Sequence, residues 1–261
     1  MVSETASKQT FFGIATLLFA ASVAVTIVWG ISMSAMDGMP MPGGWTMSMT
    51  WMTGPGWLGA MLSFLGMWFV MMVAMMMPSL VPTLWRYRQA IGGANQTHSG
   101  WMITLAGLGY FAVWTVFGIV AYPLGIALAV LEMQTPALSR AVPIAIGFII
   151  LIAGALQFTQ WKAHHLVCCR ETPTHSCTLP APASSAWRHG LQLGWHCSRC
   201  CFGLMVILLV VGVMDLRAMF VVAIAITLER LLPAGERVAR FTGGVAIAAG
   251  IFLIARAAGL G

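Results

Sequence analysis

Six cysteines gather in one stretch of the chain, between positions 168 and 201. Three of them form a C-x-x-C pattern with one more cysteine attached, and two more stand next to each other upstream, just after a pair of histidines. Two thiolates at C-x-x-C spacing can bind one metal ion, and a pair from another segment can complete the site. The predicted ligands are Cys168, Cys169, Cys197, Cys200, Cys201, His164 and His165.

The type of ligand limits which metals this cluster would bind. Four thiolate and imidazole ligands would suit Zn²⁺, whereas two or three thiolates would suit Cu(I). Arg170, Arg199 and the start of a helix near Cys197 are expected to favour the thiolate form. Two alternatives use the same cysteines: thiol redox chemistry, or packing as small hydrophobic side chains.

Methionines form a second group of soft ligands. Met67, Met71 and Met75 are four residues apart, so they lie on one face of a helix, and Met72 and Met76 form a neighbouring stack. Thioethers favour Cu(I) over hard cations, so the first face could line a path for copper. The alternative is packing, because methionine fills irregular gaps.

A methionine-rich segment precedes this helix. Residues 32–56 contain seven methionines with many glycines and prolines, and Asp37 is their only charged residue. The absence of Lys and Arg is typical of a loop outside the cytoplasm, and the glycines and prolines argue against a regular helix. Such a loop could capture Cu(I), or it could be an interfacial loop anchored by Trp45, Trp51 and Trp57.

The elements that position these ligands are predicted to be membrane helices. Charged residues make up 8% of the chain and hydrophobic residues 59%, whereas a soluble domain has about 25% charged residues. We therefore expect an all-α, polytopic transmembrane helical bundle in a single domain, 1–261. The net charge of +6 forms no basic stripe of the kind that binds nucleic acid.

Hydrophobic runs predict about seven spans. Asp215 and Arg217 interrupt the longest run, and we expect a tight outer turn there; a single helix over 201–228 would give six spans instead. Arg86 and Arg88 mark a cytoplasmic edge, which places the N-terminus in the cytoplasm. The expected spans are 11–31, 57–84, 102–124, 141–161, 195–214, 217–232 and 241–260, with a Cys/His-rich cytoplasmic segment over 162–199.

A few residues within the spans carry further expectations. Gly147 and Gly154 are candidates for close helix packing. Glu229 and Arg230, at the inner end of a span, are expected to form an ion pair or to be interfacial charges. Asp215 is expected to pair with Arg217 at the outer edge.

Several of these residues together resemble a known family. Ala74-Met-Met with Pro78-Ser79, then Gln157-Phe-Thr with Lys162, and finally the Cys197-x-x-Cys200-Cys201 block follow one another in order. This pattern resembles a bacterial family described as predicted metal-binding integral membrane proteins, a domain of unknown function with AMM-x-P-S and C-x-x-C-C motifs. The resemblance covers roughly 60–250 and implies the bacterial inner membrane and metal binding. The chain departs from it with His165 in place of an expected cysteine.

These observations predict a metal-handling membrane protein. The leading hypothesis is Cu(I) binding, or inward transfer from the outer methionine-rich loop to cytoplasmic cysteines. The alternatives are a membrane thiol redox protein or sensor, and a structural or assembly subunit with a zinc site. We expect the lipid bilayer, a metal ion and a metallochaperone or membrane protein as partners, and no enzymatic activity, since no hydrolase, kinase or nucleotide-binding motif is present.

Overall fold

Helices account for nearly all of the described chain. The computed structural model describes residues 2–34, 39–41, 45–47, 56–91, 96–170 and 183–259. The helices are α1 (Val2–Ser34), α2 (Trp57–Ile91), α3 (Gln96–Gln134), α4 (Pro136–Leu156), α5 (Gln160–Arg170), α6 (Ala183–Val211), α7 (Leu216–Leu231) and α8 (Gly235–Ala257). A short antiparallel hairpin, β1 (Met39–Met41) with β2 (Trp45–Met47), lies between α1 and α2.

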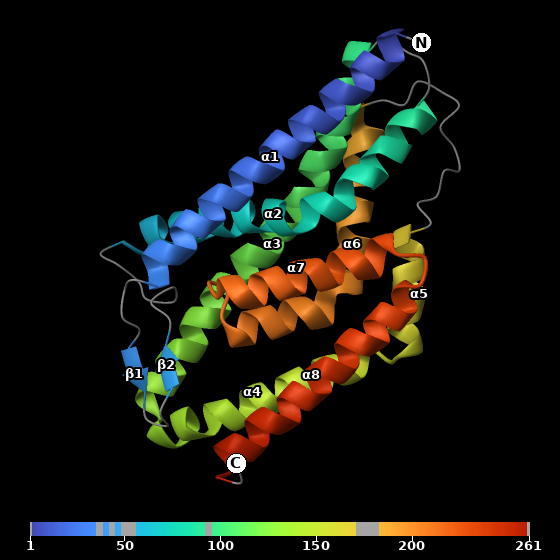
Figure 1. Ribbon diagram of the computed structural model, residues 1–261. Coiled ribbons are helices and arrows are strands. Elements are labelled where there is room, and N and C mark those ends of the chain that lie inside the picture. Colours follow the sequence, from blue (N-terminus) through green and yellow to red (C-terminus); the bar gives the residue numbers. More distant parts are fainter. Residues whose placement is uncertain are drawn as a thin grey trace.

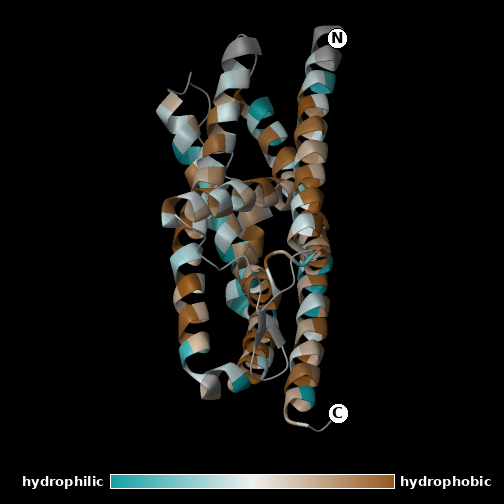
Figure 2. Cartoon of the chain, turned by 90° about the vertical axis from the view of Figure 1, so that its left-hand side faces the viewer, coloured by the Kyte–Doolittle hydropathy of each residue, from teal (hydrophilic) through white to brown (hydrophobic). Residues whose placement is uncertain are grey.

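Six of these helices are long and apolar enough to cross a membrane: α1, α2, α3, α4, α6 and α8. Hydrophobic residues recur along the long helices (Figure 2). On α1, for example, Leu17 and Leu18 are both exposed. The prediction of a polytopic helical bundle is confirmed, with six candidate spans and α7 as a shorter, seventh apolar helix.

The predicted turn near Asp215 is present and has two local causes. Gly212 has a φ of 135°, a conformation that favours glycine. The Asp215 carboxylate then caps α7 by accepting hydrogen bonds from the backbone N–H groups of Arg217 (2.8 Å) and Ala218 (3.0 Å). The single helix over 201–228 that the six-span alternative assumed is therefore wrong, although six helices are candidate spans. The expected pair between Asp215 and the side chain of Arg217 is replaced by this cap.

Glycines bring two pairs of helices into close contact. Gly147 and Gly154 of α4 lie against the backbone of Gly250 and Gly243 of α8, so close that an added Cβ would meet a carbonyl oxygen at about 3 Å. Their predicted role in close packing is confirmed. On the α3–α6 contact, a Cβ at Gly190 would overlap the backbone of Ala106. Figure 1 shows α4 and α8 side by side at one edge of the bundle and α1 along α2 at the opposite edge.

The centre of the bundle is built around α2. This helix packs against α1, α3 and α7, and it changes direction along its course in Figure 1. Pro78 and Pro82 lie inside it, and each removes one backbone hydrogen bond. The Trp68 indole N–H donates to the carbonyl of Trp114 at 2.8 Å, which fixes α2 against α3. One continuous helix therefore connects the end nearest the methionine-rich segment with the end that carries Arg86.

Candidate metal centre

The C-x-x-C-C cysteines lie inside the bundle. Cys197, Cys200 and Cys201 are at most 1% exposed, and they sit in the interior of α6, which begins at Ala183. The expectation that a helix starts near Cys197 is wrong, because α6 begins 14 residues before Cys197 (197 minus 183). The positive end of the helix dipole is too distant to stabilise these thiolates.

Two cysteines one helical turn apart bring their sulfur atoms close together. The Sγ atoms of Cys197 and Cys201 are 3.8 Å apart, because residues four apart share a helix face. Cys200 also lies within hydrogen-bonding reach of Cys201. Cys197 thus has a close sulfur contact with Cys201, its neighbour one helical turn away, in addition to the C-x-x-C spacing that the sequence pattern emphasises.

A methionine from α2 adds a third sulfur atom. The Sδ atom of Met76 lies 4.0 Å from Cys197 Sγ, and Met76 is fully buried. Ligands bound to one metal ion at about 2.3 Å are about 3.8 Å apart in a tetrahedral arrangement and about 4.0 Å apart in a trigonal one. Both separations at Cys197 fall on these values. Cys197 is therefore spaced from each of the other two sulfur atoms as a ligand of the same ion would be, and we call Cys197, Cys201 and Met76 the sulfur triad.

Two polar side chains donate hydrogen bonds to the Cys197 sulfur. The Tyr110 hydroxyl donates at 2.9 Å and Arg230 Nη1 at 3.1 Å. Arg230 Nη1 also donates to Ser79 Oγ at 2.8 Å, which links α7 to α2 beside the triad. Donors and a positive charge at a sulfur atom favour its thiolate form, the form that binds metals.

Cys169 extends the cluster towards α5. It is buried, its Sγ donates to the carbonyl of His196 at 3.1 Å, and it lies within hydrogen-bonding reach of Cys200. Burial and the neighbouring Cys200 raise the pKa of the Cys169 thiol. Four of the predicted cysteine ligands are thus brought together. The side chain of Cys168 and those of the methionines in 34–55 lie outside the described residues.

A buried ion pair supports the cysteine-bearing part of α6. Lys162 Nζ lies 2.7 Å from Glu229 Oε2 and donates to the carbonyl of Cys200 at 2.6 Å. Thr242 and Gln157 donate to the other carboxylate oxygen of Glu229 at 2.9 and 3.4 Å. The expected ion pair between Glu229 and Arg230 is therefore wrong, since Lys162 is the partner of Glu229. Burial lowers the pKa of Lys162, but the charges of Cys200 and Glu229 outweigh that effect, and the net shift is upward.

The two predicted histidine ligands have different environments. His165 is buried with its ring against Trp161 (4.6 Å between centroids), whereas His164 is exposed, 5.5 Å from the His165 ring. Burial and Arg199 lower the pKa of His165, which keeps the imidazole neutral. Within the part of the chain that is described, no group of three or more His, Cys, Asp or Glu side chains is arranged to hold a metal ion. The sulfur triad satisfies the spacing only because it includes a methionine.

The predicted methionine face is buried along its whole length. Met67, Met71 and Met75 are between 1% and 8% exposed and belong to the same core as the cysteines. They form a column of thioethers inside the bundle, while Met76 of the neighbouring stack makes the contact with Cys197. The burial of these three thioethers is compatible both with packing and with a path for a metal ion.

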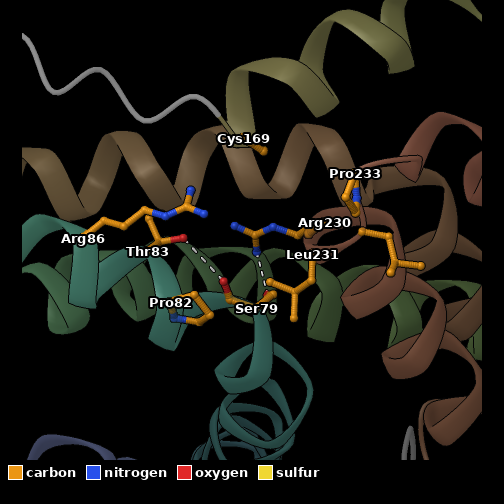
Figure 3. Close-up of a pocket in the computed structure, with 9 residues that line it drawn as sticks. Ser79, Pro82, Thr83, Arg86, Cys169, Arg230, Leu231 and Pro233 are labelled. Carbon is orange, nitrogen blue, oxygen red and sulfur yellow. Dashed lines mark hydrogen bonds between the residues drawn. The ribbon is translucent and has the colours of Figure 1, made fainter. Parts of the chain in front are cut away.

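A cavity adjoins the triad at the end of α2. It has a volume of about 260 Å³ and lies between α2, the end of α5 and the turn from α7 to α8. Its walls include Ser79, Thr83, Arg86, Cys169 and Arg230. Figure 3 shows the guanidinium groups of Arg86 and Arg230 directed towards each other. Arg230 therefore contacts both the cavity and the sulfur triad.

The sequence did not identify Tyr110, Arg230 or Met76 as part of a metal centre. Tyr110 and Arg230 are far from Cys197 in the chain, so no local spacing connects them. The sequence places Met76 on the second methionine stack rather than on the face expected to line a copper path. Which of the two stacks contacts Cys197 depends on which side of α2 packs against α6. The one available signal was chemical, since Arg230 and Lys162 are charged residues close to apolar spans.

Comparison with known proteins gives one match. A family model described as "PpoB2: Copper chaperone" matches residues 65–253 of the 261-residue chain. The matched region contains α3 to α7 whole, most of α2 and α8, and all members of the sulfur triad. No curated protein and no solved structure matches the chain.

Proposed function

The chain belongs to the PpoB2 family of copper chaperones, and from this premise we propose that it carries Cu(I) within the membrane, bound by Cys197, Cys201 and Met76. The observation that carries the proposal is the pair of sulfur separations at Cys197, 3.8 and 4.0 Å. They match one ion with sulfur ligands at about 2.3 Å. The role is binding and transfer of an ion, without catalysis.

The donor set favours Cu(I) over Zn²⁺. Two thiolates and one thioether are soft ligands, and Cu(I) prefers them, whereas hard cations do not. Structural zinc sites use four nitrogen or sulfur ligands, and the described residues offer no such group of His, Cys, Asp and Glu. A three-sulfur site is therefore better matched to Cu(I).

The charge balance of the site supports a monovalent ion. A Cu⁺ ion bound by two thiolates has one net negative charge, which is costly to bury without compensation. The guanidinium of Arg230, 3.1 Å from Cys197 and buried, supplies one positive charge. With Zn²⁺ the same group would leave an excess positive charge in the core.

The same ligands suggest a direction of transfer. The methionine-rich segment 32–56 lies at one end of α2, the thioethers of Met67, Met71 and Met75 follow along the helix, and the cysteines come next. We place the end with Arg86 in the cytoplasm, because Arg and Lys flank short inner loops. Copper would then move inward from thioethers to the more strongly binding thiolates.

Cu(I) binding by the purified protein tests the site. The affinity should be measured by competition with a chromogenic Cu(I) chelator under reducing conditions, for the wild type, Cys197→Ser and Met76→Leu. We expect the loss of a thiolate to lower the affinity at least about 100-fold, and the loss of a thioether about tenfold. Met72→Leu is the control, because Met72 is equally buried on α2 and should retain wild-type affinity.

X-ray absorption of the copper-loaded protein gives an independent readout. A shell of sulfur atoms at about 2.3 Å is expected, with fewer sulfur neighbours in Met76→Leu. Unchanged affinity in Cys197→Ser, or a shell of nitrogen and oxygen ligands, would refute the sulfur triad. Binding of Zn²⁺ in preference to Cu(I) would instead favour a structural or assembly role.

Transfer requires a separate measurement. In proteoliposomes, Cu(I) offered on the side of the methionine-rich segment should reach a chelator in the lumen, and replacing Met39, Met41, Met47 and Met49 by Leu should slow this uptake. Equal rates of Cu(I) uptake by the wild type and by the protein with these four replacements would exclude the loop as the capture site. Redox-dependent labelling of Cys197 and Cys201 without metal would support the thiol redox alternative.

A further inference from the structure

The cavity beside the sulfur triad has a strongly cationic wall. Two of its nine lining residues, Arg86 and Arg230, are cations, and none is an acid. Their guanidinium groups point towards each other in Figure 3. Two like charges that face one space repel each other, and an anion between them removes that repulsion.

A buried, unpartnered donor points to the same ligand. Arg230 is 6% exposed, and its Nη2 atom has no hydrogen-bond partner among the described residues, although Nη1 has two. A buried charged donor without a partner is costly, so such atoms mark places where a ligand is expected. The hydroxyl of Ser79, beside Arg230, lines the same space.

The cavity also borders the cysteine cluster that contains the sulfur triad. Cys169 lines its wall, and Cys169 lies within hydrogen-bonding reach of Cys200. Pro82, Leu231, Leu232 and Pro233 complete the surface with apolar groups. The volume of about 260 Å³ admits a small molecule, below the usual range for drug-sized ligands.

We propose that this cavity binds a small anionic thiol that takes Cu(I) from the sulfur triad by way of Cys169. This inference rests on the proposed function and names the acceptor class for the same copper. The carboxylate of the thiol would bind Arg86 and Arg230, since guanidinium groups favour carboxylates. Its sulfur would then lie against the Cys169 wall.

The transfer is a ligand exchange without redox chemistry. Copper passes first from the sulfur triad to Cys169 and then from Cys169 to the incoming thiol. In each exchange a Cu–S bond forms to the arriving thiol, and a Cu–S bond to the sulfur that is released breaks. The proton of the arriving thiol goes to the released sulfur, so that atoms and charge balance. Copper stays Cu(I) throughout, and no oxidant or reductant is consumed.

Matched thiols test the inference on the copper-loaded full-length protein in detergent. Mercaptoacetate and 2-mercaptoethanol are similar in size, and only the first has a carboxylate. The measured quantity is the rate of copper release with mercaptoacetate divided by the rate with 2-mercaptoethanol. We expect Arg86→Gln to lower this ratio about tenfold. Arg188→Gln makes the same change in net charge on an exposed residue of α6 and should leave the ratio unchanged.

Two further measurements separate this inference from the proposed function. The Cu(I) affinity of Arg86→Gln, measured with a chelator, should equal that of the wild type, because Arg86 is not part of the sulfur triad. Mercaptoacetate should also bind to the copper-free wild type in calorimetry, and less tightly to Arg86→Gln. A protein that binds mercaptoacetate but no copper would refute the proposed function while the cavity remained an anion site.

Three outcomes would overturn the inference. The first is a release ratio that is the same in the wild type and Arg86→Gln. The second is an equal decrease in Arg86→Gln and Arg188→Gln, which would indicate a general effect of charge. The third is a loss of the preference for mercaptoacetate when phosphatidylglycerol is added, which would assign the cavity to a lipid headgroup phosphate.

Discussion

Replacing Lys162 by methionine would leave the buried carboxylate of Glu229 without its cation. Nζ and Oε2 are 2.7 Å apart, and the two side chains are only 5% and 2% exposed. Breaking a buried ion pair by removing one partner costs about 3–5 kcal/mol. Thr242 and Gln157 still donate to the carboxylate, so we expect the lower end, about 3 kcal/mol. For a chain of this size that corresponds to a fall in Tm of about 6–12 °C.

The assay is thermal unfolding of the purified protein in detergent, with one rescue and one control. Lys162→Met/Glu229→Gln removes both charges and should regain at least half of the lost Tm. Glu236→Gln breaks the pair of Glu236 with Arg240, whose atoms are 3.9 Å apart and whose side chains are more than half exposed. Such exposed pairs contribute well under about 1 kcal/mol, so the control should shift Tm by about 2 °C or less.

The upward pKa shift of Lys162 predicts how the Tm difference between the wild type and Lys162→Met depends on pH. A raised lysine pKa contributes stability that is fully present below the unfolded value of about 10.4 and is lost only as the pH rises through the folded value. Burial raises the pKa of the Glu229 carboxyl as well, so the variant is relieved only where this carboxyl becomes protonated at lower pH. The Tm difference between wild type and Lys162→Met should therefore not decrease as the pH rises from about 7 to about 9. A Lys162→Met variant as stable as Glu236→Gln, or a double variant no more stable than the single one, would refute the assignment of a stabilising buried pair.

Three further variants test the helix contacts by the same thermal assay. Gly190→Ala should destabilise the protein by about 3 kcal/mol because its Cβ would overlap the α3 backbone, whereas Gly107→Ala, with nothing within 4 Å, should be neutral or stabilising. Asp215→Ala removes the cap of α7 and should cost about 1 kcal/mol, and an unchanged Tm would show that the turn holds without it. Trp68→Phe removes the hydrogen bond to the Trp114 carbonyl and should cost about 1 kcal/mol; a loss of several would point to a packing defect instead.

The membrane helices could be predicted from the sequence because hydrophobic runs report them directly. The break at Asp215 was predictable for the same reason, since a charged residue inside an apolar run is costly unless it lies at a turn. Gly147 and Gly154 were also identified correctly, because small residues in apolar helices mark close contacts. These features depend on local composition, and no knowledge of the neighbouring helices was needed.

The depth of Cys197 in α6 could not be predicted in this way. The polar residues between 183 and 199 favoured a cytoplasmic segment, but α6 already begins at Ala183. Its first part is held by close contact with α3, where Gly190 and Gly194 meet the backbone. Tertiary packing therefore decided the start of the helix, and with it the position of the cysteines.

The choice of partners at the site was equally non-local. Both methionine stacks of α2 are buried, so their spacing could not show that Met76, and not Met75, faces Cys197. Glu229 is adjacent to Arg230 in the chain but pairs with Lys162, 67 residues away. Consecutive residues on a helix point in different directions, which explains why the neighbour in sequence was the wrong partner.

The shortness of α7 has a consequence for the surrounding lipid. Its 16 residues extend about 24 Å at about 1.5 Å per residue, whereas the hydrocarbon core of a bilayer is about 30 Å thick. If α7 crosses the bilayer as the expected seventh span, the lipid next to it would thin, or headgroups and water would dip towards its ends. Arg230 lies near one of those ends. The polar boundary of the bilayer would then come nearer to the sulfur atoms, and the water-free part of an ion's route would be shorter. Copper handling by this protein should thus depend on acyl-chain length, and thicker bilayers should slow it.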